Sequence, residues 1–327
     1  MESMNISTSV SEFIMVGFST FGHFRPLIFM VLLVIYFLII FGNLSISVLI
    51  LYDRHLQTPM YLFISMFSFL EILFTTVSIP FMLTNIWKGE VQIEFSHCML
   101  QMYLLHSWGI TENYLLNIMA YDRMVAICDP LRYHVIMTSN HCTVLLLSCW
   151  LLGFTSPIVH LVSVLKLPFC GPNTINHLFC DLFPLLKLAC TDTSYTFILN
   201  FLISLCIISG TFLFIILTYL KVIFTILKIR CMDGRKKAFS TCASHLTIVL
   251  LFYGSLAFIY IRPRVDYTPE YDKIIAINYS VLIPFLNPII YSFRNREIKN
   301  ALKKLLKRKK RFITTFMPHG QNIIIRS

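Results

Sequence analysis

The sequence predicts an all-α membrane protein in which one bundle of helices crosses the bilayer seven times. The composition gives the first reason: of 327 residues, 57% are hydrophobic and only 13% are charged, about half the share of roughly 25% that soluble domains carry. The second reason is that apolar runs near 20 residues long, enough to cross a bilayer, recur along the chain. The third is that most basic residues lie on one side of these runs. Lipid, rather than one large core, therefore accounts for the apolar residues.

The seven predicted spans form a single bundle, because the sequence shows no repeat of about 20–50 residues and no low-complexity domain. They cover residues 26–52, 59–86, 98–121, 143–165, 194–220, 238–261 and 274–293. The domain organisation follows from these limits. Residues 1–25 form an extracellular N-terminus, residues 26–293 form the seven-transmembrane domain, and residues 294–327 form a basic cytoplasmic tail.

Lys and Arg are unevenly shared between the two sides of the predicted bundle. With the N-terminus outside, the inner loops and the tail hold 20 of the 27 basic residues, and the outer segments hold seven. Basic residues near transmembrane helices mark the cytoplasmic side, so the C-terminus is expected inside the cell. The net charge of +11 also raises the hypothesis of nucleic-acid binding, but such proteins carry their basic residues on a polar domain. We therefore expect the bilayer, and no nucleic acid, as the partner of these charges.

Four of the ten cysteines fall on the oxidising, outer side in this orientation. They are Cys98, Cys170, Cys180 and Cys190. Four cysteines make two disulfides, with three possible connectivities. A metal site at His177, Cys180 and Asp181 would need a free thiol at Cys180, and a disulfide there is the favoured interpretation, so no metal is predicted. Three Asn-x-Ser/Thr sequons occur, but Asn43 and Asn278 lie inside spans, which leaves Asn5 as the predicted glycosylation site.

Two carboxyl side chains are predicted near the middle of the bilayer. Glu71 lies 12 residues into the second span and Glu112 lies 11 residues before Arg123, which corresponds to depths of roughly 18 and 16 Å. Asn43 and Asn287 also lie within spans. Ionisable groups at this depth indicate function, so we expect a polar cluster that holds Na⁺, a proton or water. The alternative is a pair of protonated acids that bond to neighbouring hydroxyl groups.

Asp122 and Arg123 lie side by side at the inner end of the third span. The carboxylate can hold the guanidinium by a charge-assisted bond, and an arginine released from it could contact a partner on the inner face. The pair would then act as a two-state switch. The alternative is an interfacial arginine that reaches the lipid headgroups.

Five motifs occur in order along the predicted spans. They are GN at 42–43, PMYLF at 59–63, MAYDRMVAIC at 119–128, KAFSTCASHL at 237–246 and NPIIYSFRN at 287–295. Together, over about residues 10–306, they resemble the olfactory branch of the rhodopsin-like G protein-coupled receptors, in its tetrapod-type class II. The chain departs from the usual pattern at Met124, Gln57 and Glu71 and in its long basic tail, and Met124 puts the efficiency of coupling in doubt.

The resemblance implies how several of these residues work. Disulfides would join Cys98 to Cys180 and Cys170 to Cys190. Arg123, held by Asp122, would engage the G protein while Tyr219 and Tyr291 rearrange. Residues 237–246 would form the inner end of a mobile sixth helix. Residues 296–306 would form a short amphipathic helix, with Ile298, Leu302, Leu305 and Leu306 facing lipid and Lys299, Lys303 and Lys304 facing phosphates.

The resemblance also implies a ligand pocket in the outer half of the bundle, with Tyr253 as an aromatic switch beneath the ligand. The matching positions are His106, Gly109, Ile110, Asn113, Ile203, Ser204, Ile207, Leu256, Ala257, Tyr260 and Ser280. This mostly apolar set suits a small, lipophilic, largely uncharged ligand. The absence of an acid at Leu105 argues against a cationic amine. Ile203 and Ile207 have the alternative of facing lipid.

By the same resemblance the chain is expected to bind a volatile odorant and to activate a stimulatory, olfactory-type G protein that raises cAMP. Trafficking chaperones would assist delivery to the plasma membrane, in particular to the cilia of olfactory neurons. No enzymatic activity and no cofactor are expected beyond Na⁺ or a proton at Glu71 and Glu112.

Four other interpretations compete with this one. A transporter would show symmetric halves or interrupted helices, and neither is evident. A retinal protein needs a lysine in the last span, and residues 274–293 contain none. An intramembrane enzyme needs a nucleophile and base at similar depth, and none stands out. A rhodopsin-like receptor for another lipophilic ligand, expressed outside the nose, stays open.

Overall fold

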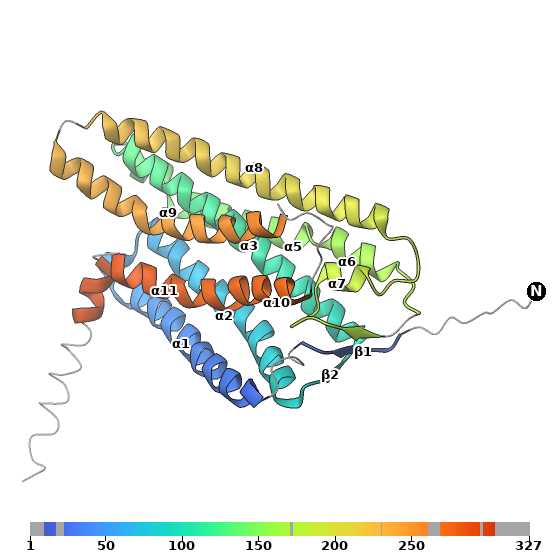
Figure 1. The fold of residues 1–327 in the computed structure, drawn as a ribbon. Coiled ribbons are helices and arrows are strands. Elements are labelled where there is room, and N and C mark those ends of the chain that lie inside the picture. The colour runs from blue at the N-terminus through green and yellow to red at the C-terminus, as the bar shows by residue number, and fades with distance from the viewer. Residues whose placement is uncertain are drawn as a thin grey trace, which may run out of the picture.

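The computed structural model describes residues 10–17, 23–170, 173–229, 231–260, 269–294 and 297–304, and these residues form a helical bundle with a small sheet at one end (Figure 1). The bundle consists of α1 (Arg25–Tyr52), α2 (Pro59–Lys88), α3 (Phe95–Cys128), α5 (Ser139–Thr155), α6 (Ile158–Leu165), α8 (Ser194–Leu227), α9 (Met232–Tyr260), α10 (Pro269–Ile277), η4 (Asn278–Leu282) and α11 (Ile283–Arg294). The shorter elements are β1 (Glu12–Met15), η2 (Arg54–Leu56), β2 (Val91–Glu94), α4 (Tyr133–Ile136), β3 (Thr174–Ile175) and α7 (Leu182–Leu186). The end that carries the sheet is the one predicted to lie outside the cell, and is called the outer end below.

Five helical segments of the described chain are long and apolar enough to cross a membrane. They are Arg25–Tyr52, Pro59–Lys88, Ser139–Leu165, Ser194–Leu227 and Asp272–Tyr291. The two other predicted spans are the helices α3 and α9, which complete the bundle with a more polar composition. Helix α3 packs against α2, α5, α8 and α9, so many of its side chains meet protein instead of lipid. A helix surrounded by protein can carry polar groups that a lipid-facing helix cannot.

Several helices extend beyond the predicted spans. Helices α3 and α8 each contain 34 residues, which corresponds to a length of roughly 50 Å. The hydrocarbon layer is only about 30 Å thick, so both helices project into water at one or both ends. Their apolar cores predict the spans, but the polar turns that continue each helix do not stand out from a loop in the sequence.

Prolines shape four of the spans. Pro26 and Pro59 stand in the first turns of α1 and α2, where the missing N–H costs nothing. Pro157 separates α5 from α6, so the fourth span consists of two helices. In the seventh span the π-helical segment η4 comes directly before α11, whose second residue is Pro284. A proline ring clashes with the carbonyl four residues earlier, and the wider π turn accommodates it.

Three short strands cover the outer end. Strand β1, from the N-terminal segment, pairs antiparallel with β2 of the first outer loop and parallel with β3 of the second outer loop, giving the order β2-β1-β3. Phe13 and Met15 on β1 are fully buried and belong to a second apolar core that also contains the Cys98–Cys180 region. Asn85 of α2 holds the end of the strand, because its amide accepts from Gly17 N (3.1 Å) and donates to Met15 O (2.9 Å). The sequence did not predict this sheet.

A further helical segment, residues 297–304, follows α11 and overlaps the amphipathic helix expected at 296–306. Its Ile298 is fully buried against the bundle, so the expectation that this side chain faces lipid was wrong. Tyr61 of α2 donates a hydrogen bond to Glu297 Oε2 (2.7 Å), which brings the segment under the bundle. Lys299, Lys303 and Lys304 are exposed, while Leu302 is 38% exposed. Leu305, Leu306 and the rest of the tail lie outside the described residues.

Candidate ligand cavity and inner switch

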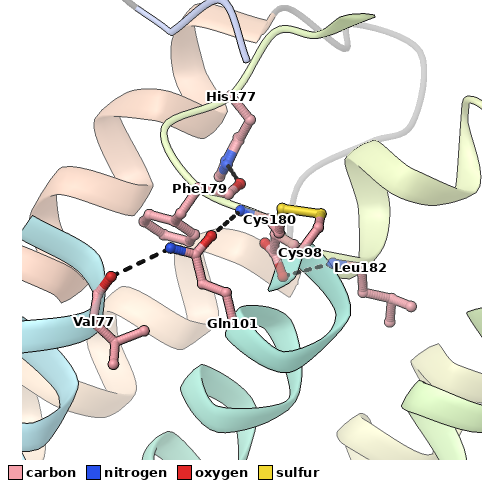
Figure 2. The surroundings of a disulfide bond; sticks show 8 residues. Val77, Cys98, Gln101, His177, Phe179, Cys180 and Leu182 are labelled. Carbon is pink, nitrogen blue, oxygen red and sulfur yellow. Dashed lines mark hydrogen bonds between the residues drawn. A yellow bond between two sulfur atoms is a disulfide. The ribbon is translucent and has the colours of Figure 1, made fainter. Parts of the chain in front are cut away.

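The second outer loop is fixed to the top of α3 by a disulfide between Cys98 and Cys180 (Figure 2). The amide of Gln101 reinforces this connection. Its Nε2 donates to Val77 O (3.3 Å) and its Oε1 accepts from Cys180 N (2.9 Å). The loop therefore joins both α2 and α3, and residues on either side of Cys180 are held over the bundle.

A second disulfide, Cys170–Cys190, closes the same loop on itself. His177 donates from Nδ1 to Phe179 O (2.9 Å), and the Phe179 ring is buried beneath the loop (Figure 2). Because the Cys180 sulfur is bonded to Cys98, it is not available as a metal ligand, in agreement with the choice of a disulfide over a metal site there.

A cavity of about 980 Å³ lies below this loop. Its size is at the upper end of the range for small-molecule sites. The wall comes from α2, α3, α6, α7, α8, α9, α10, η4, α11 and the second outer loop, and most of its side chains are aliphatic or aromatic. Seven of the predicted pocket residues line it: His106, Gly109, Ile110, Asn113, Ser204, Ile207 and Leu256.

Three predicted pocket residues do not line the cavity. The Ser280 hydroxyl donates to Ala276 O (2.5 Å), one turn earlier in the chain, and lies 3.9 Å from Met82 Sδ of α2. Ile203 lies beside the row of α8 side chains that faces the cavity, and is partly exposed on the bundle surface. Tyr253 lies in the bundle below the cavity and is 5% exposed. The side chains of Ala257 and Tyr260 lie outside the described part of the chain, as does Asn5.

The sequence did not predict the contribution of α6 and the second outer loop to the cavity. His160, Phe179, Asp181 and Phe183 all line the cavity. A bridge from Cys98 to Cys180 would have indicated the loop residues, because it holds their neighbours over the third span. The loop supplies the carboxyl group of Asp181, and Glu112 and Asp272 also line the cavity. The absence of an acid at Leu105 therefore does not make the cavity free of acids.

The floor of the cavity is a hydrogen-bonded network between three helices. The Tyr253 hydroxyl on α9 donates to Asn113 Oδ1 on α3. Asn113 Nδ2 donates in turn to Thr211 Oγ1 on α8 (3.0 Å), and Asn117 Nδ2 donates to the Tyr253 oxygen (3.4 Å). Asn113 borders the cavity and Tyr253 lies behind it, so an occupant that moves Asn113 would disturb all three helices.

The predicted intramembrane cluster is present in part. Asn287 Nδ2 donates to Glu71 Oε1, which connects the seventh span to the second. Asn43 instead donates to two backbone carbonyls, Ile39 O (3.1 Å) and Pro284 O (3.4 Å). Glu112 Oε1, Asn287 Oδ1 and Ser68 Oγ are buried without a partner among the described residues. Such unpaired oxygens fit a bound cation, a proton or water.

The inner end of α3 carries the Asp122–Arg123 pair. Arg123 donates to Asp122 Oδ2 from Nε (3.0 Å) and Nη2 (2.5 Å), with 13% of its side chain exposed. An arginine this buried is not reaching for headgroups, so the snorkelling alternative does not describe this arrangement. The other carboxylate oxygen, Oδ1, accepts from the Tyr133 hydroxyl (2.7 Å). Burial and the Asp122 charge raise the pKa of Tyr133 well above its usual range, so this hydroxyl keeps its proton.

The other two predicted switch residues lie in the inner half of the bundle. Tyr219 of α8 is 2.7 Å from His245 Nδ1 on α9, and His245 Nε2 is 3.1 Å from Leu116 O on α3. A carbonyl only accepts, so Nε2 carries the proton and the Tyr219 hydroxyl donates to Nδ1. Tyr291 is buried, and its hydroxyl has no partner among the described residues.

The chain is similar to known proteins over almost its whole length. A family model described as olfactory receptor matches residues 32–309. Human olfactory receptor 6N1 is 48% identical over 92% of this chain and 96% of its own length. Human olfactory receptor 6K3 is 48% identical over 93% of this chain and 92% of its own length. The dog olfactory receptor-like protein OLF1 is 44% identical over 92% of this chain and 97% of its own length.

Proposed function

This chain belongs to the olfactory receptor family, and from that premise we propose that it is an odorant receptor whose ligand occupies the cavity beneath the second outer loop. The family consists of seven-helix membrane receptors and not of enzymes. Within it, the motifs in the sequence favour the tetrapod-type class II. The single observation that carries the proposal is the cavity of about 980 Å³, which lies above a polar floor shared by three helices.

The ligand is a small volatile molecule that is mainly lipophilic. Aliphatic and aromatic side chains make up most of the wall, and burial of apolar ligand surface against them contributes about 25 cal/mol per Å². The outer loop covers this space, because the Cys98–Cys180 disulfide fixes it to α3.

The signal passes from the cavity floor to the inner switch. A ligand that displaces Asn113 or Tyr253 alters the contact of α9 with α3. Helix α9 also carries His245, which bonds to Tyr219 of α8 and to the backbone of α3. When α9 moves, Arg123 leaves Asp122 and binds a stimulatory, olfactory-type G protein, while Tyr219 and Tyr291 rearrange. Na⁺ or a proton at Glu71 and Glu112 stabilises the resting arrangement.

The receptor lies in the plasma membrane with its N-terminus outside the cell, glycosylated at Asn5, and reaches the cilia of olfactory neurons with the help of trafficking chaperones. The basic inner loops and tail support this orientation. The basic segment that follows α11 lies at the anionic inner leaflet.

The test is a cAMP reporter assay in cells that display the receptor, challenged with a broad odorant panel. We expect one or more odorants to raise cAMP in a saturable manner. Arg123→Ala provides the matched control: it removes the contact with the G protein and should abolish the response at unchanged surface level. A well-displayed receptor that stays silent across the panel, while related receptors respond, would contradict the proposal.

A further inference from the structure

One corner of the cavity holds two imidazoles and a carboxylate. We call it the acceptor corner and define it as His106 of α3, His160 of α6 and Asp181 of the second outer loop, all three of which line the cavity. The two imidazole rings have centroids 5.7 Å apart. His106 Nε2 is 3.5 Å from Asp181 Oδ1.

The protonated nitrogen of His106 follows from its backbone contact. Its Nδ1 lies 2.8 Å from Met102 O. A carbonyl oxygen can only accept a hydrogen bond, so Nδ1 carries a proton. In the neutral ring the other nitrogen, Nε2, is then an acceptor, and it is the atom that lies next to Asp181.

The protonated nitrogen of His160 follows in the same way. Its Nδ1 lies 2.5 Å from Asn200 Oδ1. The orientation of this amide is fixed, because Asn200 Nδ2 donates to Thr196 O (2.7 Å). The atom that faces His160 is therefore an oxygen, Nδ1 carries the proton, and Nε2 of the neutral ring is an acceptor without a partner among the described residues.

Asp181 adds further acceptors. Its Oδ1 already accepts from the backbone N–H of Leu182 (2.8 Å), and a carboxylate oxygen has room for more than one donor. If a proton moves onto His106 Nε2, that ring pairs with Asp181, and His160 Nε2 is still an acceptor. Both protonation states leave more acceptors than donors in the corner.

We propose that the acceptor corner selects ligands that carry a neutral hydroxyl group, that is, alcohols or phenols. This inference rests on the proposed function and names the ligand class for the same cavity. The hydroxyl donates to Nε2 of His160 or His106, and the hydrocarbon part of the ligand packs against the apolar wall. A buried acceptor left unpaired costs free energy, so an analogue without the donor is penalised.

A protonated amine also carries donors, but the cavity suits it less well. Burying an ammonium requires full compensation of its charge. Carboxyl groups of Glu112, Asp181 and Asp272 line the cavity together with the ammonium of Lys187. Within the acceptor corner, however, Asp181 already accepts from the Leu182 N–H and lies 3.5 Å from His106 Nε2. A metal ion is the other cation that imidazoles bind, but no three His, Cys, Asp or Glu in the described residues are placed to hold one. A neutral donor needs neither a charge partner nor a third ligand.

The experiment compares ligands that differ in one group. Alcohols, their methyl ethers and the corresponding amines, on the same aliphatic and aromatic skeletons, are tested by cAMP reporter on the full-length receptor. Ketones and esters serve as odorants without a donor. We expect half-maximal concentrations about tenfold lower for the alcohol than for its methyl ether.

His160→Phe keeps an aromatic ring but removes the acceptor, so the alcohol-to-ether ratio should fall to about one while the ether response persists. His160→Gln, which retains an acceptor oxygen, should preserve part of the preference. Surface display is measured for each variant. If His160→Phe fails to reach the surface, the alcohol-to-ether potency ratio of the wild-type receptor still tests the proposal.

The possible outcomes separate this inference from the proposed function. If ethers, ketones or amines act at least as strongly as alcohols on the wild-type receptor, the acceptor corner does not select hydroxyl groups, although the chain is still an odorant receptor. If the alcohol preference persists in His160→Phe and in His106→Phe, the corner is not its source. If the displayed receptor responds to no compound, both proposals fail.

Discussion

Gly109 gives the cavity part of its volume, because no atom lies within 4 Å of the position that a Cβ would take there. A side chain at this position would therefore occupy empty space and would not clash with the protein. The glycine determines how large a ligand can be, independently of the polar groups that determine what kind of ligand it is.

We predict that Gly109→Leu narrows the range of active ligands without harming folding. The added side chain fills part of the cavity, so bulky odorants should lose potency by about tenfold or more. A loss of about 1.4 kcal/mol of binding free energy weakens affinity tenfold. Small odorants should keep theirs. Concentration–response curves for a size-graded ligand series, normalised to surface level, check this. A uniform loss across all sizes would contradict a filling effect.

Tyr133 is the residue whose role the family motif did not indicate. It donates to one oxygen of Asp122 while Arg123 donates to the other, so both residues stabilise the buried carboxylate in the resting arrangement. We predict that Tyr133→Phe raises basal cAMP roughly fivefold, as expected for the loss of a bond worth about 1 kcal/mol. The phenol pKa is raised, so the bond is kept below and above neutral pH, and basal activity of the wild type should not change between about pH 6 and 9. Basal activity that stays low in the variant would show that the bond does not restrain Arg123.

For single residues, the sequence predicts which ones matter better than it predicts which way their side chains point. His106, Asn113 and Ile207 border the cavity, as the family resemblance implied. Ser280 does not, since the π-helical segment that contains it rotates the chain relative to a regular helix. His160 could not be predicted, because its helix begins after Pro157 and the orientation of α6 depends on that break.

Helix α3 packs closely against α5 at Gly153. A Cβ on Gly153 would lie 3.0 Å from Thr111 Cα, a backbone atom that cannot move aside. Close packing through small residues is a usual way for membrane helices to associate.

We predict that Gly153→Ala lowers the amount of folded receptor. Overpacking of this kind costs about 1–3 kcal/mol, so surface display should fall severalfold, as measured by antibody staining of intact cells. Gly210→Ala in α8 is the matched control, because nothing lies within 4 Å of its Cβ position and alanine is the better helix former. Equal surface levels for the two variants would mean that the α3–α5 contact can adjust.

Helices as elements were largely predictable, because a membrane requires about 20 apolar residues in a row. Their ends were not. The inner end of α8 runs through Lys221 to Leu227, beyond the predicted limit at residue 220, since a helix in water needs no apolar pattern. The burial of Ile298 under the bundle was also missed, because Tyr61 and Glu297, which bring that segment close, are 236 positions apart.

Over the whole molecule, the two disulfides stabilise the folded chain to different extents. Cys98–Cys180 closes a loop of 82 residues between α3 and the outer loop, whereas Cys170–Cys190 closes one of 20. The entropy lost by the unfolded chain grows with the logarithm of loop length, which makes the longer bridge more stabilising by about 1 kcal/mol.

We therefore predict that Cys98→Ser blocks surface display and that Cys170→Ser reduces it less. Cys98→Ser also frees residues 177–181, which cover the cavity, so any receptor that does reach the surface should respond weakly. Flow cytometry of intact cells, with total expression as the reference, distinguishes the two variants. Normal surface display of Cys98→Ser would show that folding does not require this disulfide.

The outer sheet has a consequence for the order in which the protein is made. Asn173 donates to Glu12 O across 161 positions of the chain, and β1 must wait for both loop strands before it can pair. The first strand of the chain to be synthesised is thus among the last to find its neighbours, because both partner strands follow it in the sequence.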